Sequence, residues 1–372
     1  MDERRAWAIL ARAPGLAARH VHTVLTTLGD LPQVASARSA GERRLLAQAG
    51  WPAGARAFLE MPPHARIDAD LRWLDTSGAR LIPCTSPGYP PLLSALASAP
   101  PVLWVLGDAS VLVVRSLAMV GARKATPGGC ATAREFARVF VNAGLVVASG
   151  LALGIDAASH SSALAAGGTT IAVCAHGLDG VYPPEHRELA AQIRARGVLV
   201  SRFAPGCPPR RRHFPQRNRD LSGMAVGTLV IEAARVSGSL LTARSALEQG
   251  RPVFAVPGSV RNPLAAGCHA LIRQGARLAE SPHDVLDELA ITYTKQKLAP
   301  EASRLGARSC ERAPLDKDSE ILLDALDFEP VSIDTIVERT GLPSGRIASM
   351  LLILELRGRV LSHPGGRYCR LP

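Results

Sequence analysis

At 372 residues the chain is longer than one typical domain, and its 47% apolar content is enough for a substantial core, which argues against global disorder. The formal net charge of +11 favours an anionic partner, most plausibly nucleic acid. Seven cysteines are scattered without a CxxC pair, which indicates a reducing compartment without a disulfide framework or a zinc site. Because neither a secretory leader pattern nor an apolar run of about 18 residues occurs, we expect a cytoplasmic protein without a membrane partner.

Residues 1–65 are predicted to form a small helical domain. Apolar residues recur there at helical spacing, as at Ala6 and Ile9 and again at Val21 and Val24. Glycines separate the short segments. Such an array of helices is typical of packing or interaction domains and does not reveal a function.

From Gly78 onward, short β-branched runs alternate with helical segments. The expected strands cover residues 79–83, 102–106, 117–120, 144–148, 169–174, 198–201, 228–231 and 253–256. Thr126 and Pro127 provide an N-cap and a first-turn proline for the helix after the third run. This alternation predicts an α/β domain over residues 79–290, with a Rossmann-like parallel sheet covered by helices on both faces.

In such a sheet the ligand lies beyond the carboxyl ends of the strands, so the loops there are the candidate site. The candidates from these loops are Gly121, Arg123, Lys124, Ser149, Gly150, Ser237, Ser239 and Thr242. A strand, small-residue loop and helix start point backbone N–H groups at an anion, although a plain tight turn explains Gly150 equally well. The dinucleotide GxGxxG pattern and the Walker A lysine loop are both missing at this edge, so we expect no cofactor.

The most basic segment spans residues 208–223. It contains Arg210, Arg211, Arg212, Arg217 and Arg219, with Phe214 among them. Guanidinium groups bind phosphates, and an exposed aromatic ring can stack on a base, so this segment predicts contact with single-stranded nucleic acid. The alternative is a solvated basic loop in which Phe214 anchors the segment to the core. Two prolines favour a loop in either case.

A polar, non-periodic linker is expected at residues 292–317, followed by a winged-helix domain at 318–372. The tail shows helices at 319–326, 332–340 and 344–357 and short strands at 359–362 and 367–370. Its third helix is rich in apolar residues and poor in basic ones. We therefore favour a protein-contact or accessory role for this domain over binding of duplex DNA.

Several motifs together resemble the DprA (Smf) family of DNA-processing proteins. They are Tyr89-Pro90-Pro91-Leu92-Leu93, Val120–Arg123, Ser149–His160, Gly177–Asp179 with Tyr182-Pro183, Phe214–Arg219, Val236–Gly258 and Gly267–Ala276. The likeness covers residues 79 to 290, and the flanking modules match the family architecture. Ala122 stands where the family usually has serine, and Ala175-His176 replaces a more glycine-like stretch.

This resemblance implies an extended Rossmann fold that binds and protects single-stranded DNA without hydrolysing it. It also implies that the protein loads the RecA recombinase in natural transformation and forms a homodimer. On the matching positions, Arg123, the arginines before Phe214 and the run Arg217-Asn218-Arg219 would line a basic DNA pocket.

A nucleotide-processing enzyme is the rival hypothesis. The segment Gly227–Glu232 resembles part of the nucleotide phosphoribohydrolases, in which a glutamate can polarise a water molecule or hold a ribose. Glu232 has no convincing acid or metal partner nearby in the sequence. Asp156 and His160, four residues apart, could pair, but an aspartate at a helix start more often serves the helix dipole. We therefore expect no catalytic residues and no metal ligands.

Overall fold

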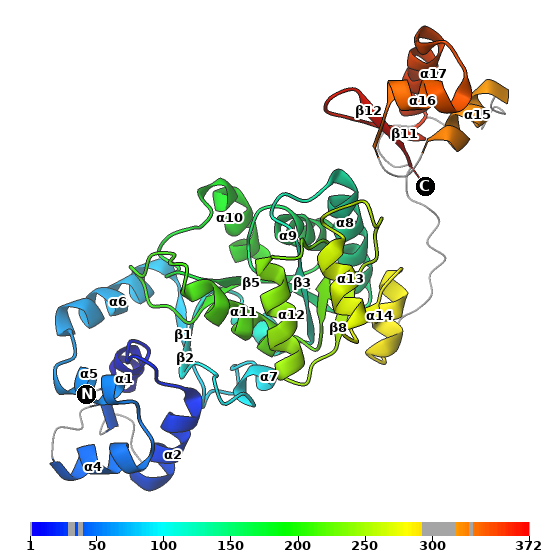
Figure 1. Cartoon of the computed structure of the whole chain (residues 1–372). Coiled ribbons are helices and arrows are strands. Elements are labelled where there is room, and N and C mark those ends of the chain that lie inside the picture. Colours follow the sequence, from blue (N-terminus) through cyan, green and yellow to red (C-terminus); the bar gives the residue numbers. More distant parts are fainter. Residues whose placement is uncertain (1, 29–33, 36–39, 292–316, 327–329, 372) are drawn as a thin grey trace. The chain divides into compact units, whose positions relative to one another are not determined.

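The structure is a computed structural model that describes residues 2–28, 34–35, 40–291, 317–326 and 330–371. The chain divides into two compact units, Met1–Thr294 and Lys295–Pro372 (Figure 1). Of the helices that are described, none is both long and apolar enough to span a membrane. The limits predicted for the separate domains stay predictions.

Helices begin the first unit, as the sequence predicts. They are α1 (Glu3–Leu10), α2 (Ala18–Leu28), α4 (Ala40–Gln48), α5 (Ala53–Glu60) and α6 (His64–Ser77). The Asp2 carboxylate caps α1 by accepting a hydrogen bond from the Arg5 N–H at 2.8 Å. Helix α6 was not predicted, because the prolines before His64 indicate a break and the residues after it are mostly polar.

A sheet of nine strands forms the centre of this unit. The strands are β1 (Arg80–Pro83), β2 (Val102–Gly107), β3 (Ser116–Val120), β4 (Val146–Ser149), β5 (Thr170–Cys174), β6 (Val198–Ser201), β7 (Thr228–Val230), β8 (Val253–Ala255) and β9 (Arg277–Leu278). Their order in the sheet is β1-β2-β6-β5-β4-β3-β7-β8-β9. The prediction of eight strands is confirmed within one or two residues at each end. Strand β9 was missed because it has only two residues, both exposed.

The predicted parallel sheet is confirmed for most of its strands, and one edge adds two antiparallel pairings that were not predicted. Strand β2 pairs antiparallel with both β1 and β6, whereas β3 to β9 pair in parallel. Apolar runs such as Val102–Leu106 are buried on both faces, and such a run has the same appearance in either strand direction. The sheet is therefore mixed, with a parallel part that carries the loops of the candidate site.

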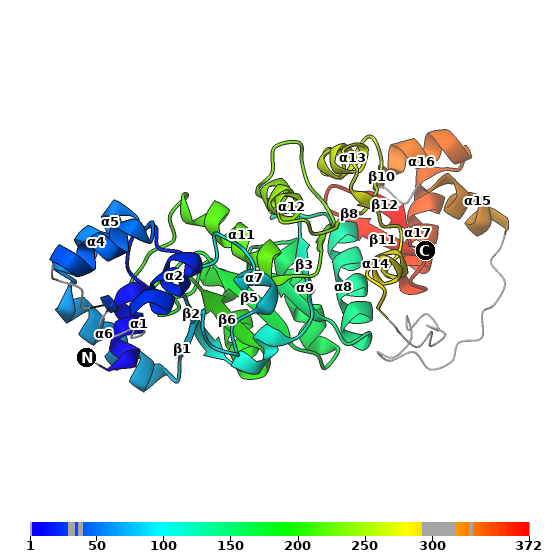
Figure 2. The same cartoon turned by 90° about the horizontal axis from the view of Figure 1, so that it is seen from below.

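Helices cover both faces of the parallel part, as predicted (Figure 2). On one face, α8 (Pro127–Asn142), α9 (Ile155–Ala165) and α14 (Pro282–Glu288) pack on Leu117 and Met119 of β3. On the other face, α11 (His213–Met224), α12 (Gly238–Glu248) and α13 (Ala266–Arg273) pack with Ala118 and Val120. The first layer continues through α10 (Arg187–Arg196). Short turns of helix occur at α7 (Pro91–Ser94), η1 (Ala109–Val113) and η2 (Pro184–His186).

The second unit is a winged helix with its own core. It contains α15 (Lys317–Ala325), α16 (Ile333–Thr340), α17 (Ser344–Leu356), β10 (Val331–Ser332), β11 (Val360–His363) and β12 (Arg367–Arg370). Leu323, Ile336 and Leu351 lie at the centre of this core. The three predicted helices and two strands are confirmed, and Gly341 turns the chain with φ of +68°. The linker predicted before Lys317 lies outside the described residues.

Candidate nucleic-acid interface

The candidate site lies where the order of the strands changes direction, with β4 on one side of β3 and β7 on the other. Loops that leave the carboxyl ends of β3, β4 and β5 meet α11 there and enclose a cavity of about 80 Å³. Its lining includes Arg123, Gly150, His176, Tyr182, Phe214 and Arg217. The loops that the sequence predicted to form the site meet at this cavity, and four of these six residues are among those predicted. Their contact with DNA stays a prediction. His176 and Tyr182 were missed as site residues, although both follow the carboxyl end of β5.

Phe214 borders this cavity with a half-buried ring, at the second position of α11. The Arg123 guanidinium lies 5.5 Å from the ring centroid, and that of Arg217 lies 5.7 Å from it. Tyr182 packs edge-on with its centroid 6.1 Å away. Cations near an aromatic face and edge-on aromatic pairs are both favourable contacts. The ring is thus held in place while part of it stays exposed, so it is not a fully buried core anchor.

The interpretation of residues 208–223 as a loop is wrong from His213 onward, because α11 begins there. Pro215 lies in the first helical turn, where the missing N–H costs no intrahelical hydrogen bond. Leu221 and Met224 then bury their side chains against the sheet. The helix sends its arginines to different sides, so the basic residues of this segment do not form one surface.

Arg217 is turned inward and is only 5% exposed. Its guanidinium donates to the carbonyl oxygens of Gly150 and, at 2.8 Å, of Val173, and so ties the ends of β4 and β5 together. Burial lowers the pKa of Arg217, and the nearby Asp156 carboxylate opposes that shift. A Cβ on Gly150 would lie 2.2 Å from this guanidinium. Position 150 therefore requires glycine because the Arg217 guanidinium lies against its backbone.

Other predicted site residues also have internal partners. The Ser149 hydroxyl is buried and donates to the Met119 carbonyl at 2.6 Å. Asn218 is buried and donates to the Gly238 carbonyl at 3.3 Å. The half-buried Ser237 caps α12 by accepting from the N–H of the buried Ser239. Thr242 is buried, and a Cβ on Gly121 would lie 2.5 Å from the Ile155 side chain. Their roles toward DNA stay predictions.

The exposed cations form the accessible part of the predicted site. They are Arg123, Lys124, Arg210, Arg211, Arg212 and Arg219. Arg219 donates to the Glu248 carboxylate at 2.5 Å and remains about half exposed. Arg123 reaches the Phe214 ring, and the run 210–212 directly precedes α11. The Phe214 ring therefore has positive charge near it from two segments, the loop that carries Arg123 and the run 210–212.

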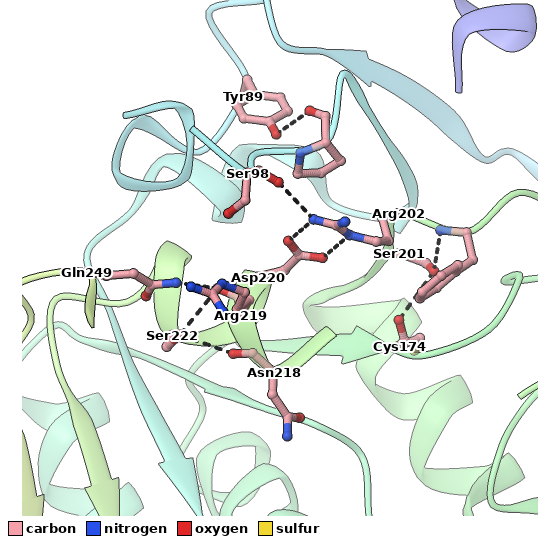
Figure 3. A network of polar contacts seen from close by, with 12 residues as sticks. Tyr89, Ser98, Cys174, Ser201, Arg202, Asn218, Arg219, Asp220, Ser222 and Gln249 are labelled. Carbon is pink, nitrogen blue, oxygen red and sulfur yellow. Dashed lines mark hydrogen bonds and ion pairs between the residues drawn. The ribbon is translucent and has the colours of Figure 1, made fainter. Parts of the chain in front are cut away.

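An ion pair between the buried Asp220 of α11 and the largely buried Arg202 holds this helix (Figure 3). The Asp220 carboxylate accepts two hydrogen bonds from the Arg202 guanidinium, at 2.6 and 2.5 Å. Arg202 also donates to the Ser98 carbonyl at 3.2 Å, beside the segment in which the Tyr89 hydroxyl donates to Pro100. Two parallel hydrogen bonds from a guanidinium to a carboxylate set the orientation as well as the distance. This pair holds the helix that presents Phe214.

The loop that leads to the arginine run is fastened from the N-terminal helices. The Pro205 carbonyl accepts from Arg12 at 2.8 Å and from Arg66 at 3.3 Å. Arg12 is itself held by the buried Asp70 carboxylate, at 2.5 and 2.6 Å. On the other side, Asp179 accepts from the Gly206 N–H at 2.7 and 2.8 Å. The start of the basic segment is thus anchored at both flanks.

The residues of the rival enzymatic hypothesis have structural partners. The Glu232 carboxylate accepts from the Thr126 N–H at 2.9 Å and from the Thr126 hydroxyl at 2.6 Å, at the start of α8. Asp156 accepts from the N–H groups of Gly150 and Ala152, while His160 contacts Thr170 instead of Asp156. No group of residues suited to hold a metal ion occurs among the described residues. Glu232 thus holds the start of α8, Asp156 holds the loop after β4, and His160 contacts the start of β5.

Comparison with known proteins decides the family. The model of the DNA recombination-mediator protein A family matches residues 80–290, and that of the DprA winged helix domain matches residues 308–366. This chain belongs to the DprA family. The resemblance stated from the motifs is thereby confirmed. Protein Smf of Escherichia coli is 40% identical over 318 residues, which cover 85% of this chain and 84% of that protein.

Two solved structures extend this similarity to the DprA fold. DNA processing protein A of Streptococcus pneumoniae superposes with a TM-score of 0.66 at 32% identity, over 77% of this chain and 99% of that one. DNA processing protein A of Helicobacter pylori has a TM-score of 0.53 at 24% identity, over 59% of this chain and 99% of that one. The α/β core with a winged helix is therefore the architecture of a DprA-family protein.

Proposed function

We propose that this DprA-family protein binds single-stranded DNA without cleaving it and protects it. The observation that carries this proposal is the partly exposed Phe214 ring, which borders a cavity and lies next to the exposed Arg123. Stacking on an aromatic ring accepts any base, and nearby cations accept the phosphates, which is how proteins bind single strands without sequence preference. A single-stranded DNA binding mode is described for the Helicobacter pylori relative.

The distribution of charge supports the same interface. Residues 78–291 hold 21 Lys and Arg against 13 Asp and Glu, whereas residues 318–372 hold six against eight. The electrostatic attraction for a polyanion therefore resides in the Rossmann-like part, and the winged helix lacks it. Because the buried Glu232 and Asp156 stabilise helix and loop ends, a non-enzymatic role fits these residues better than nucleotide hydrolysis.

The substitution Phe214→Ala tests the proposal. We expect affinity for single-stranded DNA to fall about 5- to 150-fold, which corresponds to about 1–3 kcal/mol for one stacked base. The log–log salt slope should stay nearly constant, because no phosphate contact is removed. Fluorescence anisotropy of a labelled oligonucleotide over a salt series measures both quantities. Arg211→Ala serves as a matched control, with a slope shallower by about 0.7 for one lost phosphate contact.

A duplex of the same sequence completes this experiment. The protein should bind the single strand more tightly, since α17 of the winged helix exposes leucines where a groove-binding helix needs cations. Equal affinity for the duplex, or a flat salt response, would contradict the proposal. If Phe214→Ala lowered the melting temperature strongly and left the affinity per folded molecule unchanged, the ring would serve the core instead.

Loading of RecA, formation of a homodimer and a cytoplasmic location belong to the same proposal, as the family resemblance implies. If the protein loads RecA, RecA filaments should form faster on single strands to which this protein has been added than on single strands without it. Sedimentation of the purified chain tests the dimer. A protein that binds single strands but leaves RecA assembly unchanged would retain the binding function and lose the loading function.

A further inference from the structure

Tyr182 lines two hollows at the edge of the sheet. It lies between β5 and η2, in the Gly177–Asp179 and Tyr182-Pro183 motif, to which the function proposed above assigns no role. Its side chain is 40% exposed. It lines the cavity beside Phe214 and also a second hollow of about 390 Å³. His176 is likewise common to both hollows.

The two hollows differ in size in a way that suits a chain of nucleotides. One water molecule needs about 10–15 Å³ of such cavity volume. The first cavity therefore has room for a flat ring, and the second hollow has several times that volume. The second hollow lies within the range of roughly 300–1,000 Å³ that is usual for small-molecule sites. A strand with one base at Phe214 would therefore meet a larger space on the far side of Tyr182.

The packing of Tyr182 leaves it able to accept a further flat group. Phe214 meets it at an interplanar angle of 64°, and His176 meets it at 72° with ring centroids 6.4 Å apart. Neither neighbour covers the tyrosine ring by parallel stacking. The exposed part of the ring is therefore available to a base.

The charges around the second hollow indicate which part of a nucleotide enters it. Gly177, Gly180 and Gly206 line it without side chains, and Asp179 contributes a carboxylate that accepts from the Gly206 N–H. A carboxylate disfavours a phosphate inside the hollow. Pro208 and Pro209 form its border and lead directly to the exposed run that begins at Arg210. A neutral base inside the hollow avoids repulsion from Asp179, and phosphates outside it lie toward the arginines.

We propose that Tyr182 is a second stacking platform and that the hollow beside it takes the base adjacent to the one on Phe214. This inference rests on the proposed binding of single-stranded DNA and extends it by one subsite. The strand then runs from the Arg123 side of the cavity, past Tyr182, toward Arg210–Arg212.

Binding of oligonucleotides built from abasic residues with one, two or three adjacent thymines tests the subsite. For the wild-type chain, the second thymine should tighten binding by about fivefold or more, as expected for one additional stacked base. Tyr182→Leu should lose this increment, so that it binds the one-thymine and two-thymine strands equally, even where loss of the edge-on contact with Phe214 lowers its affinity for both. Tyr182→Phe, the matched control, should retain the increment because it keeps the ring. The salt slope should be the same for all three proteins.

The outcomes separate this inference from the function on which it rests. If the wild-type chain binds the one-thymine and two-thymine strands equally, the second subsite is wrong and the proposed function stands. Equal increments in wild type and Tyr182→Leu would also overturn it. Failure to bind any single strand would remove both proposals. Should Tyr182→Leu not fold, Tyr182→Trp provides an optical test, with quenching, relative to wild type, that begins only with the second thymine.

Discussion

Arg123 and Arg217 lie at similar distances from the Phe214 ring but in opposite surroundings. Arg123 is exposed on the loop after β3, whereas Arg217 is buried and donates to the carbonyls that end β4 and β5. An exposed arginine can meet a phosphate, and a buried one with satisfied partners stabilises the fold. The sequence suggested the same role for both, because a motif gives residue types without their burial.

These two arginines should therefore respond differently to alanine. Arg217→Ala leaves two buried carbonyls without their donor, and we expect the free energy of unfolding to fall by about 2 kcal/mol or more. Arg123→Ala should leave stability unchanged and make the salt slope for single-stranded DNA shallower by about 0.7. Urea unfolding and anisotropy over a salt series measure the two effects. A stable Arg217→Ala protein with a shallower slope would show that this side chain binds phosphate.

His160 gives the Rossmann-like core a dependence on pH. Its Nδ1 lies 2.7 Å from the Thr170 hydroxyl, which donates in turn to Val147. Burial, with repulsion from His186 and Arg217, lowers the pKa of His160 from 6.5 to about 3. The unfolded chain therefore binds a proton below pH 6.5 that the folded chain rejects until about pH 3.

The contribution of His160 to stability is thus complete above its unfolded pKa and declines as the pH falls. We expect a loss of up to about 1.4 kcal/mol per pH unit between about 6.5 and 3. Urea unfolding of wild type and His160→Asn at several pH values isolates this effect, because the other titrating groups are common to both. The stability of wild type relative to the variant should decrease toward acid. The exposed His22, replaced in the same way, is the control, and equal slopes for wild type and His160→Asn would contradict the assignment.

Among the elements, α11 shows what a sequence can and cannot reveal about this site. Apolar runs predicted the strands, and the strand ends predicted that the loops of the candidate site meet at one edge, because carboxyl ends of parallel strands share one edge. The helix itself was missed, since Pro215 and the arginines suggest a loop, while Leu221 and Met224 offer only a short apolar stripe. The internal partners of Ser149, Asn218 and Thr242 depend on contacts between distant segments, which spacing along the chain does not encode.

The N-terminal helices should influence the interface through Arg12. This residue links the buried Asp70 to the Pro205 carbonyl, ahead of the arginine run. Arg12→Ala leaves a buried carboxylate uncompensated, at a cost of about 3 kcal/mol or more. We expect faster hydrogen exchange at residues 203–212 and several-fold weaker binding of single strands. Arg4→Ala, which removes only the exposed pair with Asp75, is the matched control and should alter neither quantity.

If exchange at residues 203–212 is unchanged in Arg12→Ala, then the contacts of Arg66 and Asp179 are sufficient to hold the loop. A loss of affinity equal to that of Arg4→Ala would indicate a general effect of charge.

On the scale of the whole molecule, the two units differ in charge and in surface. The winged helix carries more acidic than basic residues, and its α17 exposes Leu352 by 58% and Leu356 by 81%. A helix of this kind is poorly suited to the phosphates of a DNA groove. The acidic balance of this unit and the exposed apolar side chains of α17 therefore favour a protein-contact or accessory role, which stays a prediction.

Removal of residues 317–372 should leave the affinity for single-stranded DNA within about twofold and the salt slope unchanged, since all the proposed phosphate contacts belong to the first unit. Anisotropy titrations of the full chain and the shortened chain measure this. The unit 318–372, prepared alone, should bind neither single-stranded nor duplex DNA. Tight binding by that unit would place part of the interface in the winged helix.

The carboxylate of Glu232 at the start of α8 has a consequence for competition inside a cell. In nucleotide-binding relatives of this architecture, a helix start after a parallel strand receives the phosphates of the ligand. Here a side chain of the protein already fills that place, and a Cβ on Gly129 would lie 2.4 Å from it. A phosphate at this helix start would therefore meet the Glu232 side chain instead of free N–H groups. We therefore expect free nucleotides to be excluded from that place and to compete only weakly with single-stranded DNA, whose linked phosphates would engage several arginines at once.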